Sequence, residues 1–104
     1  MSPNASRPQE AARPKVRDEV QVPRLYRVLL HNDHYTTMDF VVDVLMQVFR
    51  KAQDEAVRIM LSVHQQGIGV CGVYPYEIAE TKVFSVHQLA EENGFPLKCS
   101  MEPE

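Results

Sequence analysis

Residues 24–49 read RLYRVLLHNDHYTTMDFVVDVLMQVF, and two different periodicities meet in them across one polar turn. The first seven residues are rich in leucine, β-branched and aromatic side chains, which is typical of a strand buried on at least one face. After the turn, Thr36 and Asp39 form a capping-box pattern that predicts a helix start. Apolar residues then recur at helical spacing, namely Met38, Val41, Val42, Leu45 and Phe49.

A second helix is predicted over residues 54–66, DEAVRIMLSVHQQ, with Gly67 as its C-terminal stop. One stripe of this helix has helical spacing and ends on a histidine; its members are Val57, Met60, Leu61 and His64. Residues 67–78, GIGVCGVYPYEI, are strand-like, and their glycines and Pro75 predict a bulge or an edge position.

A third helix is predicted over residues 80–93, before Gly94, and residues 76–78 fit either this helix or the preceding strand. Residues 96–102 alternate apolar and polar side chains, which is typical of a half-buried strand. The order β-α-α-β-α-β predicts an α+β domain of two layers, with three helices on one face of a three-stranded antiparallel sheet.

Length and composition indicate one small domain with a modest core in a chain of 104 residues. The N-terminal segment contains Pro3, Pro8, Pro14 and Pro23 but no aromatic residue, so we expect residues 1–23 to be a flexible tail and residues 24–104 to be the folded core. A net charge of -3 argues against nucleic acid and favours protein or peptide partners. Without a membrane-spanning run or a signal peptide, we expect no membrane association and a cytoplasmic location.

The polar turn brings Asn32 and Asp33 next to a helix N-terminus, and His64 falls where helical spacing predicts an apolar residue. Both the Asn-Asp turn and the position of His64 have an ordinary structural interpretation. Asn-Asp before a helix is common turn and capping chemistry, and a histidine on an apolar stripe is more often a hydrogen-bonded core residue than a ligand-binding one.

The second helix, if it packs beside the first, brings Met60, Val63 and His64 close to the turn. The facing residues of the first helix are then Met38 and Val41. Such a site combines an apolar hollow with a rim of acceptors from amide, carboxylate and neutral imidazole. An ammonium group has three N–H donors and no acceptor, so the arrangement suits a free peptide N-terminus whose first residue is large and hydrophobic.

Catalytic and metal-dependent alternatives have weaker support. His31, Asp33 and His34 could ligate a metal, but consecutive loop positions match no zinc spacing and no fourth ligand is evident. The two cysteines, Cys71 and Cys99, fit no CxxC spacing and are expected to be buried free thiols without an adjacent base. We therefore expect a non-catalytic protein without a metal or another cofactor.

Four segments together resemble the ClpS family, the adaptors of the ATP-dependent Clp protease, over essentially all of residues 24–104. They are LLHNDHYTTMDFVVDVL, MLSVHQQGIGVCGVY, EIAETKV and ENGFPLKCSME. The resemblance implies a receptor for N-degrons, which are substrates that begin with Leu, Phe, Tyr or Trp. It further implies delivery of these substrates to a ClpA-type AAA+ unfoldase, and we expect the adaptor to be a monomer.

Carried over position by position, the resemblance implies that Asn32, Asp33 and His64 hold the substrate α-amino group. The residues that it places around the hydrophobic side-chain pocket are Thr36, Met38, Val41, Met60, Val63 and Leu97, with Met38 as a gate against β-branched residues. Glu77 and Lys82 match positions that dock on the unfoldase N-domain, and the tail matches a segment needed for delivery.

Two positions depart from the family pattern. His34 stands where an acidic residue is usual, which weakens long-range attraction to a positive N-terminus. Thr37 stands where proline is usual, which removes a preset helix start. A paralogue with narrower or weaker specificity, or a generic protein-interaction module, therefore remains an alternative.

Overall fold

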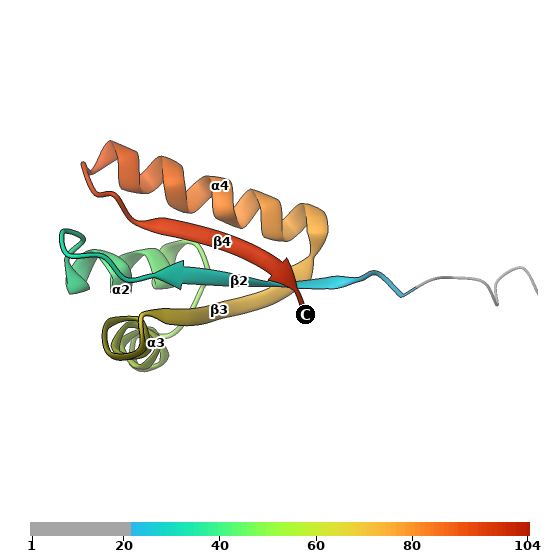
Figure 1. Ribbon diagram of the computed structural model, residues 1–104, viewed down its shortest axis with the longest axis horizontal. Helices are drawn as coiled ribbons and strands as arrows, with labels where there is room; N and C mark the ends of the chain where they lie inside the picture. The colour runs from blue at the N-terminus through green and yellow to red at the C-terminus, as the bar shows by residue number, and fades with distance from the viewer. Residues whose placement is uncertain (1–21) are drawn as a thin grey trace, which may run out of the picture.

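The computed structural model describes residues 22–104, and its helices and strands follow the predicted order (Figure 1). Their bounds are β2 Leu25–His31, α2 Met38–Gln47, α3 Gln53–Gln66, β3 Ile68–Pro75, α4 Tyr76–Glu92 and β4 Lys98–Pro103. The predicted tail lies, apart from Val22 and Pro23, outside the described residues. None of the helices within residues 22–104 has both the length and the apolar character needed to cross a membrane.

The sheet has the strand order β3-β2-β4, and both pairings are antiparallel. Leu30 of β2 lies opposite Gly69 on one side and Cys99 on the other. The pairing of β2 with β3 shifts register between Val28 and Leu29, and β3 is an edge strand. The predicted bulge and edge position are both confirmed, because glycines permit the irregular ladder and Pro75 ends it.

One hydrophobic core joins the two layers. Val28 and Leu30 alternate along β2 and are fully buried, and they belong to the same cluster as the buried residues of all three helices. In Figure 1, α4 runs along β4, and α3 lies at the end of β3 where the helix leads into the strand. The predicted α+β class, with helices packed on one face of an antiparallel sheet, is confirmed.

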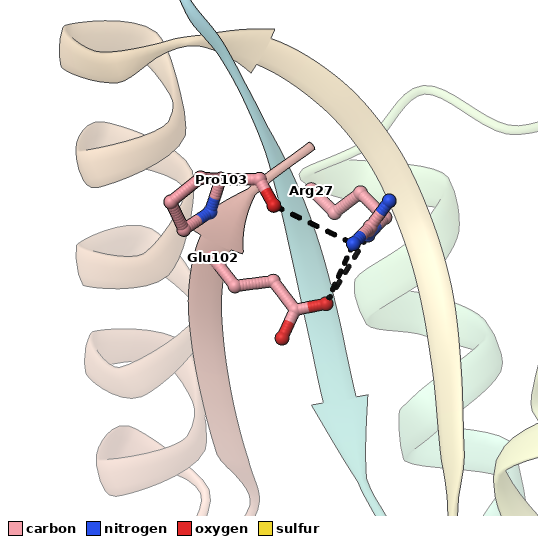
Figure 2. Close-up of polar contacts among 3 residues, drawn as sticks. All are labelled: Arg27, Glu102 and Pro103. Carbon is pink, nitrogen blue, oxygen red and sulfur yellow. Dashed lines mark hydrogen bonds and ion pairs between the residues drawn. The ribbon is translucent and has the colours of Figure 1, made fainter.

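The opposite face of the sheet is partly exposed: Leu29 of β2 is buried there, whereas Arg27 and Glu102 are partly exposed. Figure 2 shows Arg27 of β2 reaching over to β4. Its Nε and Nη2 atoms lie 3.2 and 3.1 Å from Oε2 of Glu102, and Nη2 also donates to the Pro103 carbonyl at 3.4 Å. Because both side chains are partly exposed, this pair contributes little stability.

The start of α2 differs from the prediction by one residue. Thr37, not Thr36, is the N-cap, and its hydroxyl oxygen accepts a hydrogen bond from the Phe40 amide at 3.1 Å. The Thr36 hydroxyl instead donates to Oδ2 of Asp33, so this side chain belongs to the hydrogen bonds of the turn. The helix also ends at Gln47, so Phe49 lies beyond it, although its side chain is buried in the core.

The buried face of α3 also differs from the predicted stripe. Ala56, Met60 and Val63 are buried, whereas Leu61 and His64 are exposed. A shift of one position turns a helix face by about 100°, so packing against α2 and β3 selects Val63 instead of His64. Gly67, at φ 90°, ends the helix as predicted, and residues 76–78 belong to α4.

Candidate functional site

A cavity of about 390 Å³ lies between the turn that follows β2 and the facing sides of α2 and α3. Seven consecutive residues of the chain, 32–38, form one side of it. Val41 of α2 and three residues of α3 complete the lining, namely Met60, Val63 and His64. The structure thus brings together eight of the nine residues predicted for the amine and side-chain sites; the exception is Leu97.

The turn is tied to the C-terminal end of α3 through the backbone. The Asn32 amide donates to the Gly67 carbonyl at 3.0 Å. Since His64 precedes Gly67 by less than one helical turn, this bond holds Asn32 and His64 against the same cavity. The exposed imidazole of His64 therefore borders the cavity and does not belong to the core.

Asp33 organises the turn with its carboxylate. Oδ1 accepts from the amides of Tyr35 and Thr36 at 2.8 and 2.7 Å, and Oδ2 accepts from the Thr36 hydroxyl at 2.7 Å. A carboxylate offers about four lone-pair positions, so about one acceptor position on Oδ2 remains for a ligand. The negative charge itself is retained at the cavity rim.

Electrostatics keep this carboxyl group ionised. Partial burial raises the pKa of Asp33, but the hydrogen bonds from Thr36 and Tyr35, together with the nearby His34, outweigh that effect and hold the pKa below its usual value. Asp33 therefore carries its charge throughout the neutral range.

The floor of the cavity is apolar and continuous with the core. Val41, Met60 and Val63 are buried members of the core cluster, so the floor is held by the packing that stabilises the fold. Met38 is 45% exposed and lines the mouth. Leu97 is also a buried core residue but is not part of the lining of this cavity. Its place in the side-chain pocket stays a prediction.

Three lining residues were not predicted to contribute to binding. His34, Thr37 and the 78% exposed Tyr35 all border the cavity. They belong to the same turn as Asn32 and Asp33, so their position in the chain was the available signal. The sequence did not reveal that all six residues of the turn between β2 and α2, residues 32–37, border one cavity.

Glu77 and Lys82 lie at a different place, around a cavity of about 540 Å³ between α4 and the end of α2. Lys82 Nζ donates to the Val48 carbonyl at 2.7 Å and lies 5.6 Å from the centre of the Tyr74 ring. Gln47, Val48 and Arg50 form the wall opposite α4, and none of them was predicted to matter.

The residues considered for metal binding point to different places. His31 Nε2 lies 2.6 Å from the Ser100 hydroxyl on β4, and burial followed by the charge of Lys98 lowers the pKa of His31. Asp33 is bonded within its own turn. Within residues 22–104, no three His, Cys, Asp or Glu side chains lie close enough together to hold a metal ion.

Both cysteines are buried free thiols, as predicted. Burial raises the pKa of Cys99 to about 12, and burial together with the nearby Cys99 raises the pKa of Cys71 further above the usual range. Because the thiolate is the reactive form, neither cysteine is suited to nucleophilic chemistry.

The family model of the ATP-dependent Clp protease adaptor protein ClpS matches residues 21–100. An ATP-dependent Clp protease adapter protein ClpS from Nitratidesulfovibrio vulgaris (strain DSM 19637 / Miyazaki F) is 60% identical over 87 residues, which are 84% of this chain and 87% of that protein. The ClpS of Desulfatibacillum aliphaticivorans is 65% identical over 82 residues, which are 79% of each chain.

Among solved structures, Agrobacterium tumefaciens ClpS2 bound to L-phenylalaninamide is similar to this chain with a TM-score of 0.77 and 44% sequence identity. The similarity covers 80% of this chain and all of that one. Sequence and fold agree, and the chain therefore belongs to the ClpS family, the non-catalytic adaptor proteins of the ATP-dependent Clp protease.

Proposed function

We propose that the chain binds the free N-terminus of proteins that begin with Leu, Phe, Tyr or Trp and delivers them to a ClpA-type AAA+ unfoldase. The observation that supports this proposal most strongly is that hydrogen-bond acceptors and apolar side chains line one cavity. Asn32, Asp33 and His64 border the same hollow as Val41 and Met60. An α-amino group and a hydrophobic side chain occupy adjacent atoms of the ligand, so a single cavity can accept both.

The size of the cavity is compatible with this ligand. About 390 Å³ lies in the range of about 300–1,000 Å³ that is usual for small-molecule sites. L-Phenylalaninamide, which is bound to the similar Agrobacterium protein, has a free α-amino group next to a benzyl side chain. A ligand of this chemistry would direct its ammonium group to Asp33 and its ring to the apolar floor.

The expected affinity is micromolar. Burying a Leu or Phe side chain contributes roughly 1.5–3 kcal/mol, and each hydrogen bond between the ammonium and its acceptors contributes about 1.5–3 kcal/mol. Association costs at least about 4 kcal/mol. Near the upper ends of these ranges the net is about -8 kcal/mol, which corresponds to a Kd of about 1 μM.

Two further parts of the proposal rest on the family resemblance. Glu77 and Lys82, around the second cavity, would dock the adaptor on the unfoldase N-domain, and the segment before residue 24 would assist delivery. The same resemblance is the basis for proposing a cytoplasmic monomer.

The departures from the family pattern bear on specificity. His34 borders the cavity and removes one negative charge from its rim relative to the usual acidic residue. Thr37 supplies a side-chain cap in place of the preset proline. The second departure is thus compensated locally, whereas the first is not, and this favours an adaptor with weaker affinity over one with a loosened pocket.

The decisive test compares a free and an N-acetylated peptide beginning with Phe, each labelled at the C-terminus and titrated by fluorescence anisotropy. Acetylation removes the charge and leaves the acceptors unmatched, so we expect binding at least about 100-fold weaker. A peptide beginning with Ser is the matched control for the side-chain site. Equal binding of the free and acetylated Phe peptides would exclude this function and favour a generic interaction domain.

A further inference from the structure

Gly69, the second residue of β3, lies against α3. It pairs with Leu30 of β2, and both residues are buried on the face of the sheet that carries the core. Among the glycines of residues 22–104, Gly67 and Gly94 have a positive φ and Gly69 does not. The backbone at Gly69 would therefore accept other residues, so what glycine provides at this position is space.

A Cβ atom on residue 69 would collide with α3. It would lie 2.7 Å from Cγ2 of Val63, a distance that Cβ atoms essentially never adopt, and 3.3 Å from the Ile59 carbonyl oxygen. Ile59 and Val63 are about one helical turn apart, so both contacts belong to the same stretch of α3. Glycine inside a strand often marks such a close approach.

This collision could not be relieved by rotating one side chain. Val63 is only 2% exposed, and a valine in a helix is stiff at χ1 because it is branched at Cβ. The Ile59 oxygen is a backbone atom of the same helix. An added Cβ would therefore have to push this turn of α3 away from the sheet.

Val63 connects the contact to the cavity of about 390 Å³ that residues 32–38 border, which we call the turn cavity. Val63 lines this cavity and is buried in the core cluster, as are Val41 and Met60. Gly69 lies on the sheet side of Val63. Moving Val63 away from the sheet would bring apolar atoms into the cavity and make it shallower, and the largest ligand side chains would lose their space first.

We propose that Gly69 is a positioning residue that sets the depth of the turn cavity, because its missing side chain lets Val63 lie close to the sheet. This inference rests on the proposed function and adds to it a reason why Trp and Phe are accepted beside the smaller Leu. Gly69 is not part of the cavity lining, so it acts through Val63.

The test titrates the full chain and Gly69→Ala with C-terminally labelled peptides, read by fluorescence anisotropy. The peptides begin with Trp, Phe or Leu and share the rest of their sequence. We expect Gly69→Ala to weaken Trp binding about tenfold, as overpacking by one methyl group does, and Leu binding by no more than about twofold. Phe binding should fall between the two. The ratio of the Trp and Leu affinities is the decisive quantity, because a loss of overall stability lowers both affinities alike.

The matched control is Gly72→Ala, the same substitution three positions further along β3. A Cβ atom there would meet the ring and hydroxyl of Tyr74, the far end of a side chain that does not line the turn cavity. Gly72→Ala should therefore leave the ratio of Trp to Leu affinity unchanged. An equal fall of the ratio in both variants would overturn the proposal, since any disturbance of β3 would then be sufficient.

Val63→Ala removes the methyl groups that the added Cβ would meet. In the Val63→Ala background, Gly69→Ala should change the ratio by less than about twofold, which a double-mutant cycle measures. If Gly69→Ala alone does not fold, adding Val63→Ala should restore folding, and the double variant should then favour Trp over Leu at least as strongly as the unmodified chain. A double variant that stays unfolded while Val63→Ala folds would overturn the proposal.

Unchanged affinities in Gly69→Ala, or affinities for all three peptides weakened by the same factor, would also overturn the proposal, because the depth of the cavity would then not depend on Gly69. An equal fall of the ratio with and without Val63→Ala would do the same, since the effect would not pass through Val63. Failure of the unmodified chain to bind any of the three peptides would instead refute the proposed function itself, and that result is separate from any difference between the variants.

Discussion

The turn cavity and the cavity between α4 and the end of α2 use their charged residues in opposite ways. At the turn cavity, Asp33 accepts three hydrogen bonds from its own turn yet retains a negative charge and a spare acceptor position at the rim. At the larger cavity, the Lys82 ammonium is directed to the Val48 carbonyl. The larger hollow is therefore not the better ligand site. Free acceptors beside an apolar floor distinguish the smaller one.

The strongest test of this contrast is Asp33→Ala. It removes the carboxylate that we propose pairs with the ligand ammonium, so we expect binding of a free Phe peptide to weaken about 100-fold. It also removes three hydrogen bonds of the turn, so the free energy of unfolding should fall by about 1 kcal/mol or more. Docking on the unfoldase N-domain should be unchanged, since the second cavity does not include this turn.

The control is Asp43→Ala, which removes an exposed carboxylate of α2 outside this cavity. It should leave peptide binding within about threefold of the unmodified chain. Peptide binding lost equally in both variants would mean that only the net charge of the surface matters, and the contrast between the cavities would fail.

Acid pH tests the same carboxylate. Because the pKa of Asp33 is lowered in the folded state, its contribution to stability is complete above the usual value of 3.8 and is lost as the pH falls through the lowered folded value. Thermal unfolding should therefore separate the unmodified chain from Asp33→Asn at pH 7, and the difference should shrink steadily below 3.8. A constant difference would show that the charge is not what stabilises the turn.

A smaller effect is expected from Met38→Ala, which tests the proposal that Met38 is a gate to the turn cavity. Removing this half-exposed side chain should admit peptides that begin with Ile or Val, with a gain of about tenfold in their affinity, while Phe binding falls about threefold because apolar contact is lost. Competition titration with a set of peptides measures both changes.

Met46→Ala is the matched control, since Met46 is an exposed methionine on the same helix outside this cavity. Met46→Ala should leave the affinities for Phe peptides and for Ile or Val peptides unchanged. If Ile and Val peptides remain excluded in Met38→Ala, another residue forms the gate.

The smallest effect is expected from Thr37→Pro. The φ of Thr37 is -75°, which lies within the range that proline imposes. Losing the cap lowers the free energy of unfolding by about 1 kcal/mol. Proline also restricts the unfolded chain, which raises the free energy of unfolding by about 0.4–1 kcal/mol. Denaturant titration should show Thr37→Pro close to the unmodified chain and more stable than Thr37→Ala. The reverse order would mean that the hydroxyl has a role beyond capping.

Much of the site followed from local pattern because turn residues are close together in the chain. Asn32 and Asp33 could be assigned to one rim, and Met60 and Val63 to the facing helix, before any coordinates. The choice of Thr37 over Thr36 as the N-cap could not be predicted from the sequence, since both hydroxyls are capable of capping. In the folded chain the Thr37 hydroxyl accepts from the Phe40 amide, whereas the Thr36 hydroxyl donates to Asp33.

The amino-acid sequence by itself determined the order of strands and helices, because alternation every two residues and recurrence every 3.6 residues are local properties of the chain. That order predicted the two-layer α+β class, and the likeness of four segments to ClpS proteins indicated the family. Tertiary structure decided that His64 is exposed at a cavity and not buried in the core, and that Leu97 lies outside the cavity lining. It also decided that Lys82 donates to the C-cap of α2, Val48, which lies 34 residues earlier. Those outcomes depend on how helices rotate and cross when they pack, and contacts between distant segments set that rotation.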